Sequence, residues 1–470
     1  MRLQGVTTTG IYCRATCTAR PRQENVRPMR NAVEAMSSGY RPCLLCRPDR
    51  LPEIGLGAPS VEVAFALRLI ADGYLDDATT DALATRIGYS RRHLVRLFEE
   101  HVGASPDFVA RARRAHLARR LLDESGASIA SVAFASGFRS VRQMNRVMRR
   151  LFGFSPSELR KKRRAHDRLD PLDGGLRLRV PYPGPLAVPD VISYLGARAI
   201  PGVESVVDGR YRRTMRTCGF PGVVEVAPGD EQTLEVTMHL ATFGSILDQV
   251  ERVRGLFGLR RDGREAEAAL AQDRLLGPLV RRRSGIRLAG AWDRFETAVR
   301  IIVGQQVSVA GATTVTGRLA TRFGEAIDLP LPGPLCRIFP TPAALAEADD
   351  ADFDMPRSRA RTIRAFAAAV ATGELDLARV DPLEETLARL QALPGIGPWT
   401  ANLIAARVMN HGDAFPSSDL GLRRAAGAQL GRDAPLSTAE LESLAESWRP
   451  FRATAAAYLW MSEEDTDDRT

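Results

Sequence analysis

The sequence has no uninterrupted apolar stretch of the about 20 residues that a helix needs to cross a bilayer. Although 44% of the 470 residues are hydrophobic, the richest stretches, such as residues 366–370, are soon broken by polar side chains. Residues 1–5 also provide no apolar signal segment that would carry the chain to an oxidising compartment. These absences exclude a membrane span, and we expect a cytoplasmic protein.

Cysteine is scarce, and four of the six cysteines fall in the first tenth of the chain, as a Cys-x3-Cys pair and a Cys-x2-Cys pair. They are Cys13, Cys17, Cys43 and Cys46. Two short-spaced thiolate pairs are typical of a closed tetrahedral zinc site, so we predict one zinc ion. Two disulfides, which need an oxidising compartment, and four unconnected thiols are the alternatives. Cys218 and Cys336 have no Cys or His neighbours, and we expect them to be small buried hydrophobic residues.

The chain carries a net charge of +9, with arginine far more frequent than lysine. Basic clusters recur at residues 91–92, 149–150, 160–164 and 281–283. This balance favours double-stranded DNA as the partner, while a solvated basic surface without a ligand is the alternative. At roughly 150 residues per domain, the length predicts a multidomain protein.

One pattern occurs twice in the second segment of the chain. Residues 81–106 and 128–156 each contain a short helical pattern, a glycine turn and a basic helix that ends in Gly-x-Ser-Pro. This order describes a helix-turn-helix, whose second helix places its first side chains on DNA bases. A long helix over residues 106–122 would join the copies, and a plain pair of helices is the alternative for either copy alone. The expected DNA contacts are Arg91, Arg92, Arg142 and Gln143.

A new unit begins after the basic run at 160–164. Residues 170–175 and 181–185 are rich in Pro, Gly and Asp and interrupt the helical periodicity. Residues 176–180, 222–226 and 233–238 alternate apolar and polar side chains, which is typical of half-buried antiparallel strands. From about residue 293 the periodicity is helical, so the sequence predicts a small α+β domain followed by a helical one.

Residues 393–401 read Leu-Pro-Gly-Ile-Gly-Pro-Trp-Thr-Ala between two helical segments. This pattern predicts a helix-hairpin-helix, in which Gly395, Gly397 and Thr400 bring backbone amides close to a DNA phosphate. An ordinary glycine-rich turn is the alternative. Asp419 follows one helix later at the start of another helix, where such a residue is often only an N-cap. The hairpin and the aspartate together form the signature of base-excision DNA glycosylases.

Three stretches resemble known families. Residues 1–50 resemble the methylphosphotriester-sensing zinc domain of Ada-type proteins through residues 8–14, 24–26 and 39–46. Residues 60–165 resemble an AraC-type helix-turn-helix pair. Residues 176–464 resemble AlkA-type 3-methyladenine DNA glycosylases of the HhH-GPD superfamily through residues 302–310, 339–342, 393–401, 419 and 448–452.

The resemblance to AlkA-type glycosylases implies a catalytic role for Asp419, which would stabilise the sugar cation as the glycosidic bond breaks. Relatives that also cut the backbone have a lysine where this chain has Trp399, so a monofunctional glycosylase is implied. It would use no cofactor and no iron–sulfur cluster, because no cysteine follows Cys336. The implied aromatic base pocket contains Trp399, Trp460 and Tyr194, and Leu403 and Leu420 replace aromatic residues of the family. Gln305 and Gln306 are the implied DNA contacts of the loop at 304–308, with Gln306 wedged into the vacated base stack.

The Ada-type resemblance implies that Cys13 accepts a methyl group while the other three cysteines hold the metal. Arg20 and Arg41 would then lie near the DNA phosphotriester. Methylation removes one negative charge from the zinc–thiolate centre and would favour promoter binding by the helix-turn-helix pair. RNA polymerase is a candidate partner of such a regulator, which we expect to act as a monomer. The Pro-Cys-His-Arg motif of an O⁶-alkylguanine methyltransferase is absent from the sequence.

We therefore predict a multidomain, mainly α chain with α+β parts. Its predicted domains are a four-cysteine zinc domain (1–52), a double helix-turn-helix (58–165), a linker (166–175), an α+β domain with an antiparallel sheet (176–288) and an all-α helix-hairpin-helix glycosylase domain (289–470). The predicted function is a base-excision glycosylase fused to a methylation-sensing regulator. One alternative is a transcription factor with a catalytically silent glycosylase half, and another keeps the glycosylase but makes the zinc domain purely structural.

Overall fold

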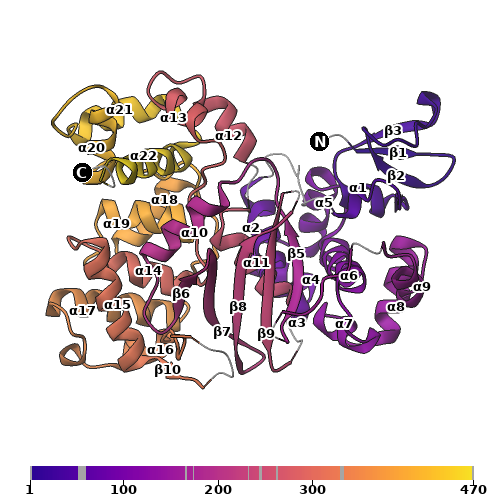
Figure 1. Cartoon of the computed structure of the whole chain (residues 1–470), viewed down its shortest axis with the longest axis horizontal. Coiled ribbons are helices and arrows are strands. Elements are labelled where there is room, and N and C mark those ends of the chain that lie inside the picture. The colour runs from indigo at the N-terminus through magenta and orange to yellow at the C-terminus, as the bar shows by residue number, and fades with distance from the viewer. Residues whose placement is uncertain are drawn as a thin grey trace. The chain divides into compact units, whose positions relative to one another are not determined.

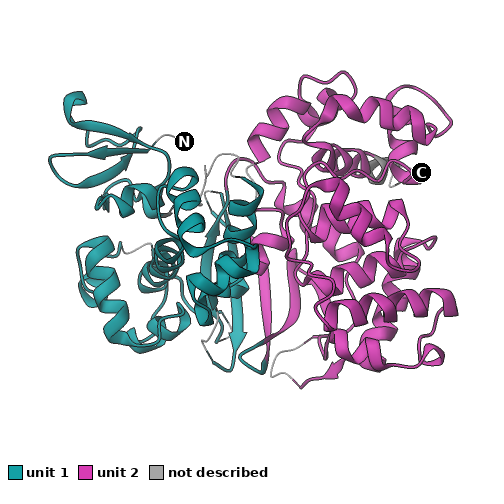
Figure 2. Ribbon diagram, turned by 180° about the vertical axis from the view of Figure 1, so that it is seen from behind, with its two compact units in different colours: residues 1–182, 217–220, 229–251 teal, residues 183–216, 221–228, 252–470 magenta. Residues whose placement is uncertain are grey.

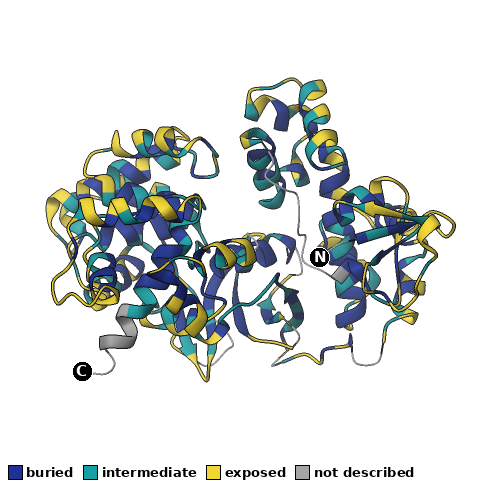
Figure 3. Cartoon of the chain, turned by 90° about the horizontal axis from the view of Figure 1, so that it is seen from above, coloured by how far each residue is buried: buried dark blue, intermediate teal, exposed yellow. Residues whose placement is uncertain are grey.

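The computed structural model describes residues 3–50, 60–164, 167–172, 174–230, 232–242, 246–260, 263–328 and 333–467. They belong to two units, which Figure 2 shows in different colours. Unit 1 takes residues 1–182, 217–220 and 229–251, and unit 2 takes residues 183–216, 221–228 and 252–470. Both units contain many buried residues, which Figure 3 colours dark blue. No helix among the described residues is both long and apolar enough to cross a bilayer.

The predicted domain borders stay predictions. The end of the first domain at residue 52 and the start of the second at residue 58 lie outside the described residues. So do residues 166 and 173 of the predicted linker and residues 468–470 of the last domain. The two units are larger than the predicted domains, and residues 176–288 contribute to both, so the units do not test these borders.

The N-terminal residues of unit 1 form a small four-stranded sheet, which the sequence analysis did not predict. Its strands, in the spatial order β3-β1-β2-β4, are β1 (Leu3–Val6), β2 (Ile11–Arg14), β3 (Val26–Met29) and β4 (Arg41–Pro42) (Figure 1). β1 pairs antiparallel with β2 and β3, whereas β2 pairs parallel with β4. Helix α1 (Ala32–Ser37) follows β3. The pairing of β2 with β4 brings Cys13, near the end of β2, beside Cys43, which directly follows β4.

Eight helices occupy the described part of unit 1 between residues 60 and 164. They are α2 (Val61–Ala71), α3 (Tyr74–Asp77), α4 (Thr80–Ile87), α5 (Arg91–His101), α6 (Pro106–Glu124), α7 (Ile129–Ala135), α8 (Val141–Phe152) and α9 (Pro156–Lys161). Each helix from α4 to α9 begins after a serine or threonine whose hydroxyl accepts a backbone N–H of the first turn. These N-caps satisfy N–H groups that a helix start leaves without partners.

The two predicted helix-turn-helix copies are confirmed as α4–α5 and α7–α8. Gly88 ends α4 at φ 85°, a left-handed conformation that glycine adopts without steric cost. The predicted joining helix over 106–122 is confirmed as α6, which continues to Glu124. Helix α6 packs against α7 and α8 of the second copy and against α2, which in turn packs against α4 and α5 of the first copy, so α6 connects the two copies.

Unit 1 also contains two of the predicted strands. β5 (Leu176–Pro181) pairs antiparallel with β9 (Thr233–Leu240), with Leu178 opposite Val236. Both of these residues are fully buried, as the alternation of apolar and polar side chains predicts. Helix α11 (Ile246–Leu256) follows β9 in sequence.

Unit 2 contains most of an antiparallel hairpin that the sequence analysis missed. β6 (Glu204–Val207) pairs with β7 (Arg210–Thr217), and most of β8 (Phe220–Pro228), the third predicted strand, lies beside β7. Helix α10 (Val188–Ala197) precedes them. The missed strands contain buried charges: Arg213 of β7 bonds Glu204 of β6 and Glu296 of the helical part. This charged pattern hid the strands from an analysis based on hydrophobic alternation.

The rest of unit 2 is helical, as predicted, apart from a two-residue ladder between β10 (Glu325–Ala326) and β11 (Arg337–Ile338). Its helices are α12 (Gly263–Leu270), α13 (Leu276–Arg282), α14 (Arg294–Val303), α15 (Val309–Phe323), α16 (Pro342–Glu347), α17 (Arg357–Ala371), α18 (Leu383–Gln391), α19 (Pro398–Leu403), α20 (Leu420–Gln429), α21 (Thr438–Ala445) and α22 (Arg452–Asp467). A π-helical turn, Ile404–Val408, extends α19, and short 3-10 turns in the chain cover Gln23–Asn25, Pro48–Arg50, Asp350–Asp352 and Glu446–Trp448. The multidomain, mainly α fold with α+β parts is therefore as predicted.

Two expectations about cysteine are wrong. Cys218 and Cys336 are exposed rather than buried. Cys218 adopts a positive φ of 49° in the turn between β7 and β8, and Cys336 directly precedes β11. Both lie at the ends of strands, where a side chain meets solvent, and a lone cysteine carries no pattern that reports this.

Candidate functional site

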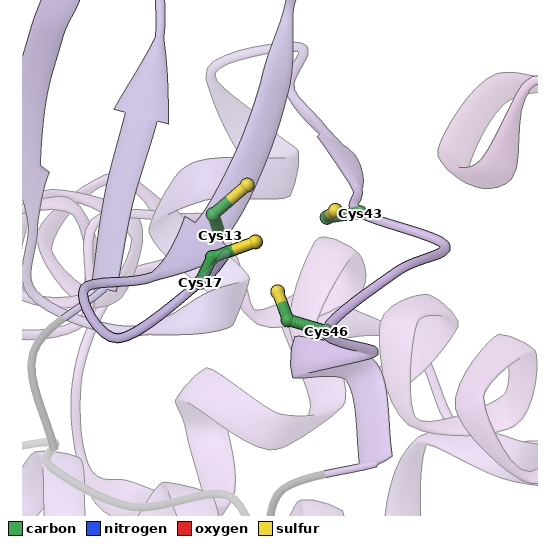
Figure 4. Close-up of side chains that lie close together, drawn as sticks. All are labelled: Cys13, Cys17, Cys43 and Cys46. Carbon is green, nitrogen blue, oxygen red and sulfur yellow. The ribbon is translucent and has the colours of Figure 1, made fainter. Parts of the chain in front are cut away.

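The four predicted metal ligands lie together in unit 1. Their Sγ atoms are all within 4.8 Å of one another, and in Figure 4 the four side chains point toward a common centre. In a tetrahedral site with Zn–S bonds of about 2.3 Å, the sulfurs are about 3.8 Å apart, so a small contraction suffices to bind the ion. The cysteines are free thiols, and Cys13, Cys17 and Cys43 are buried. The donor set and its spacing therefore fit zinc.

Neighbouring groups give the thiols different acidities. Burial, together with the adjacent thiols, raises the pKa of Cys13 well above its usual value. Burial also raises the pKa of Cys46, to about 11. Burial opposes ionisation of Cys43 too, but the backbone N–H groups of Cys46 and Leu45 donate to its sulfur and hold its pKa below the usual value. A zinc ion must therefore displace protons from at least two of these sites.

Buried polar contacts fasten this zinc module to the helix-turn-helix pair within unit 1. Arg47, directly after Cys46, bonds Asp123 of α6 at 2.7 Å, and both side chains are nearly inaccessible to solvent. Asn31 Nδ2 donates to the carbonyl of Val102 at 3.1 Å, immediately beyond the C-terminus of α5. The metal site and the first recognition helix are thus parts of one packed structure.

The predicted DNA-contacting residues of unit 1 lie at helix starts or on the surface. Arg91 and Arg92 are exposed in the first turn of α5, and Arg142 is exposed in the first turn of α8. Gln143 is only half-buried, but its Oε1 accepts the backbone N–H of Arg139 at 3.0 Å. Arg20 is exposed in the loop after Cys17.

The side chain of Arg41 lies beside the end of α8, a contact that the sequence analysis did not predict. It packs against Gly153, the residue that ends α8. A Cβ on Gly153 would lie 2.6 Å from Arg41 Nη1. Arg41 is nevertheless exposed, so the role of both Arg20 and Arg41 at a phosphotriester stays a prediction.

Unit 2 contains the predicted hairpin, in which α18 and α19 flank a turn at residues 392–397. Gly395 has a φ of 78°, and Gly397 is the exposed N-cap of α19. Thr400 is buried in the first turn of α19. A Cβ on Gly397 would meet no atom within 4 Å, so the N-terminal end of α19 is open at this residue, as a phosphate-binding turn requires.

The carboxylate of Asp419 is held by three N–H donors. Trp399 Nε1 donates to Oδ2 at 2.8 Å, and Trp460 Nε1 donates to Oδ1 at 3.0 Å. The backbone N–H of Leu422 also donates to Oδ1 at 3.0 Å, so Asp419 is the N-cap of α20 as well. The side chain is only partly buried, and Leu420 beside it is 46% exposed. The arrangement fixes one carboxylate at an open edge of unit 2 between two indoles.

Two of the predicted pocket residues, Trp399 and Trp460, contact the Asp419 carboxylate, and Tyr194 lies in a separate pocket lining. Trp399 and Trp460 contact Asp419 directly and pack against the hydrophobic core cluster that contains buried Leu403. Tyr194 instead lines a mostly apolar pocket whose lining includes Trp460 but not Asp419. The guanidinium of Arg198 lies 3.8 Å from the centre of the Tyr194 ring, so one face of this ring is covered. Sequence reasoning named both tryptophans as stacking partners but missed their bonds to Asp419.

Four known protein families match successive parts of the chain. The metal binding domain of Ada matches residues 3–49, and a helix-turn-helix domain matches residues 83–162. The AlkA N-terminal domain matches residues 177–293, and the HhH-GPD superfamily of base excision DNA repair proteins matches residues 299–450.

A Mycobacterium tuberculosis protein described as a probable bifunctional transcriptional activator/DNA repair enzyme AlkA is 38% identical over 466 residues, which cover 98% of this chain and 92% of that protein. The chain belongs to this AlkA fusion family. Its AlkA-type half is also 33% identical over 277 residues to DNA-3-methyladenine glycosylase 2 of Escherichia coli, covering 58% of this chain and 93% of that enzyme. The solved 3-methyladenine DNA-glycosylase of Archaeoglobus fulgidus shares the fold with a TM-score of 0.52 at 23% identity, over 62% of this chain and 98% of that one.

The hairpin of the AlkA-type half makes one sharp prediction. A Cβ on Gly395 would lie 2.0 Å from Thr362 Oγ1, and the left-handed backbone adds a further cost. We expect Gly395→Ala to lower the free energy of unfolding by about 3 kcal/mol. Gly397→Ala is the matched control, because Gly397 has a φ of −88° and nothing within 4 Å of its Cβ position. Urea denaturation of both variants checks this, and equal stability losses would contradict it.

Proposed function

We propose that the AlkA-type half of this chain is a monofunctional DNA glycosylase that removes alkylated bases. The observation that carries the proposal is the Asp419 carboxylate, fixed between two indole N–H groups at a partly open edge. A carboxylate in that position stabilises the positive charge that develops on the sugar as the bond from C1′ to the base breaks. The base leaves with the bonding electrons, and water adds to C1′ and loses a proton.

The two tryptophans suit a cationic base. Each indole N–H lies in the plane of its ring and donates to Asp419, so the ring edges face the carboxylate, and both tryptophans are partly exposed. An alkylated purine carries positive charge, and an indole face attracts such a cation. The base must leave the duplex to reach this position. Leu403 and Tyr194 would complete the pocket, in which the guanidinium groups of Arg198 and Arg407 lie 3.8 Å and 5.6 Å from the centre of the Tyr194 ring.

The positions of the lysines support the proposal of a monofunctional enzyme. The sequence has two lysines, Lys161 and Lys162. Neither lies within residues 183–470, and Trp399 fills the hairpin position of the family's nucleophilic lysine. Without a lysine amine, this half cannot form a Schiff base with the sugar by that route. Its product would be an intact abasic site.

Chromatography of the products from alkylated duplex DNA tests the glycosylase proposal. We expect the full chain to release free 3-methyladenine and to leave alkali-labile sites in an uncut strand. A transcription factor with a silent glycosylase half would bind the DNA and release no base.

We further propose that the zinc module accepts a methyl group on Cys13 from a DNA phosphotriester and so acts as the sensor of the regulatory half. The sulfur of Cys13 would form the new C–S bond as the phosphate oxygen leaves the methyl carbon. Removal of one negative charge from the centre favours DNA binding by α5 and α8. We expect this regulator to act as a cytoplasmic monomer that meets RNA polymerase at its promoter.

Peptide mass spectrometry after incubation with methylated DNA tests the sensor and must identify the modified cysteine. Cys13 is only 2% exposed, whereas Cys46 is partly accessible. We expect one methyl group on Cys13, and Cys13→Ser should leave the other three cysteines unmodified. Methylation of Cys46, or four unmodified cysteines with zinc bound, would show that the module does not sense damage through Cys13.

A further inference from the structure

The side chain of Gln305 joins two loops that the proposed glycosylase would present to DNA. Gln305 lies just after α14, in the loop that precedes α15. Its Nε2 donates to the carbonyl of Gly395 at 3.0 Å and to Thr400 Oγ1 at 2.9 Å. Both N–H groups of the amide therefore bind the hairpin. The sequence analysis assigned Gln305 to DNA contact, but its donors are already committed within unit 2.

Helix α17 contacts both the loop at Gln305 and the hairpin at Gly395. Arg359, in its first turn, donates to the backbone carbonyl of Gln305 at 2.6 Å. Thr362, one turn later, lies so close to Gly395 that no Cβ fits there. The hairpin, the loop at Gln305 and α17 are thus connected in a closed set of contacts, each element touching the other two.

Gln306, the next residue, is the predicted wedge. It is exposed and adopts a φ of 54°, in the left-handed region that non-glycine residues rarely occupy. Such a conformation is strained and persists where neighbouring contacts fix the backbone. The bonds of Gln305 on its side chain and on its carbonyl oxygen supply that constraint directly beside Gln306.

We propose that Gln305 is a positioning residue that fixes Gln306 against the hairpin, so that Gln306 enters the base stack when the damaged base leaves it. This inference rests on the proposed glycosylase function. The hairpin binds the DNA backbone and sets the position of the duplex, while Gln306 fills the vacated space. Gln305 keeps the distance between these two contacts constant.

The variant Gln305→Met keeps the length of the side chain and removes both donors. We expect its single-turnover rate of base release to fall about 30-fold on a lesion paired within a duplex, since small misplacements at such sites are costly. On the same lesion in an unpaired bulge, where no wedge is needed, the loss should stay below about 3-fold. Equal losses on both substrates would show a general structural defect and overturn the proposal.

A double-mutant cycle adds a second test. If Gln305 acts through Gln306, then Gln306→Ala should remove most of the effect of Gln305→Met on paired DNA. Independent, multiplying effects would overturn the proposal. The matched control is Gln429→Met, an exposed glutamine at the end of α20, for which we expect wild-type rates.

Base unstacking gives a readout that does not depend on excision. Duplex DNA with 2-aminopurine beside the target position should gain fluorescence when saturated with the wild-type chain, and less with Gln305→Met. If the wild type unstacks the base but releases none, the glycosylase proposal fails and the positioning role stands. If both proteins unstack the base equally, the positioning role fails.

Discussion

Asp419→Asn lowers the single-turnover rate of 3-methyladenine release by about 10²–10³-fold or more and leaves the protein folded, because one preorganised electrostatic contact at the reacting centre contributes that much. Asparagine removes the negative charge beside C1′ and keeps the size of the side chain. It also keeps the N-cap of α20, since Asn and Asp cap helices about equally well.

The cost of Asp419→Asn outside catalysis is small and specific. One indole N–H, from Trp399 or Trp460, would face the new amide NH₂ instead of an acceptor, which costs about 1–3 kcal/mol if the group stays buried. Thermal unfolding of the variant and its affinity for undamaged duplex DNA report that cost separately. Asp413→Asn is a matched control, because Asp413 also precedes α20 and its carboxylate bonds Arg449 and Arg452 rather than the two indoles. A variant at Asp419 that keeps more than about a tenth of the wild-type rate would contradict electrostatic stabilisation by this carboxylate.

Removal of zinc unfolds the N-terminal module. Structural zinc–thiolate sites have apparent binding free energies of about 10–16 kcal/mol, and the β strands of this module are four residues long or shorter. We expect amides of β1 and β2 to lose hydrogen-exchange protection on chelation. The loss should occur more readily at acidic pH, because protons then compete for the thiolates, whose pKa values at Cys13 and Cys46 are raised by burial.

The unfolding should extend to the first recognition helix. Two side chains of the zinc module donate hydrogen bonds to backbone carbonyls just after α5. Asn31 Nδ2 donates to the carbonyl of Val102, and Ser37 Oγ donates to the carbonyl of Gly103. We therefore expect reduced protection near residues 100–103 after chelation, while α20 in unit 2 keeps its protection. Unchanged exchange in β1 and β2 after complete metal removal would contradict a structural role for the ion.

Local spacing made much of the molecule predictable. The two cysteine pairs, the two glycine turns before α5 and α8, and the hairpin at Gly395 each depend on residues within a few positions of one another. Side-chain chemistry at such short range determines backbone geometry almost alone. The joining helix α6 was also predicted from its local helical pattern, and it is buried on most sides, with the charged residues Arg113, Arg119 and Asp123 among the buried ones.

Contacts between distant residues were not predictable in the same way. The indoles of Trp399 and Trp460 reach Asp419 across 20 and 41 positions, and Gln305 reaches Gly395 across 90. The hairpin of β6 and β7 was missed because Arg213 and Glu204 are buried as an ion pair, whereas a hydropathy pattern assigns charged residues to the surface. In each case the deciding partner is set by tertiary packing and leaves no local pattern.

The central claim, that Asp419 stabilises positive charge on the sugar, is tested most directly by binding of two abasic-site analogues in otherwise identical duplexes. One analogue carries a cationic pyrrolidine ring in place of the sugar, and the other a neutral tetrahydrofuran ring. We expect the wild-type chain to prefer the cation on the order of 100-fold, as is typical of a transition-state mimic, and Asp419→Asn to lose this preference. Equal affinities for the two analogues, or a preference that survives in Asp419→Asn, would contradict it.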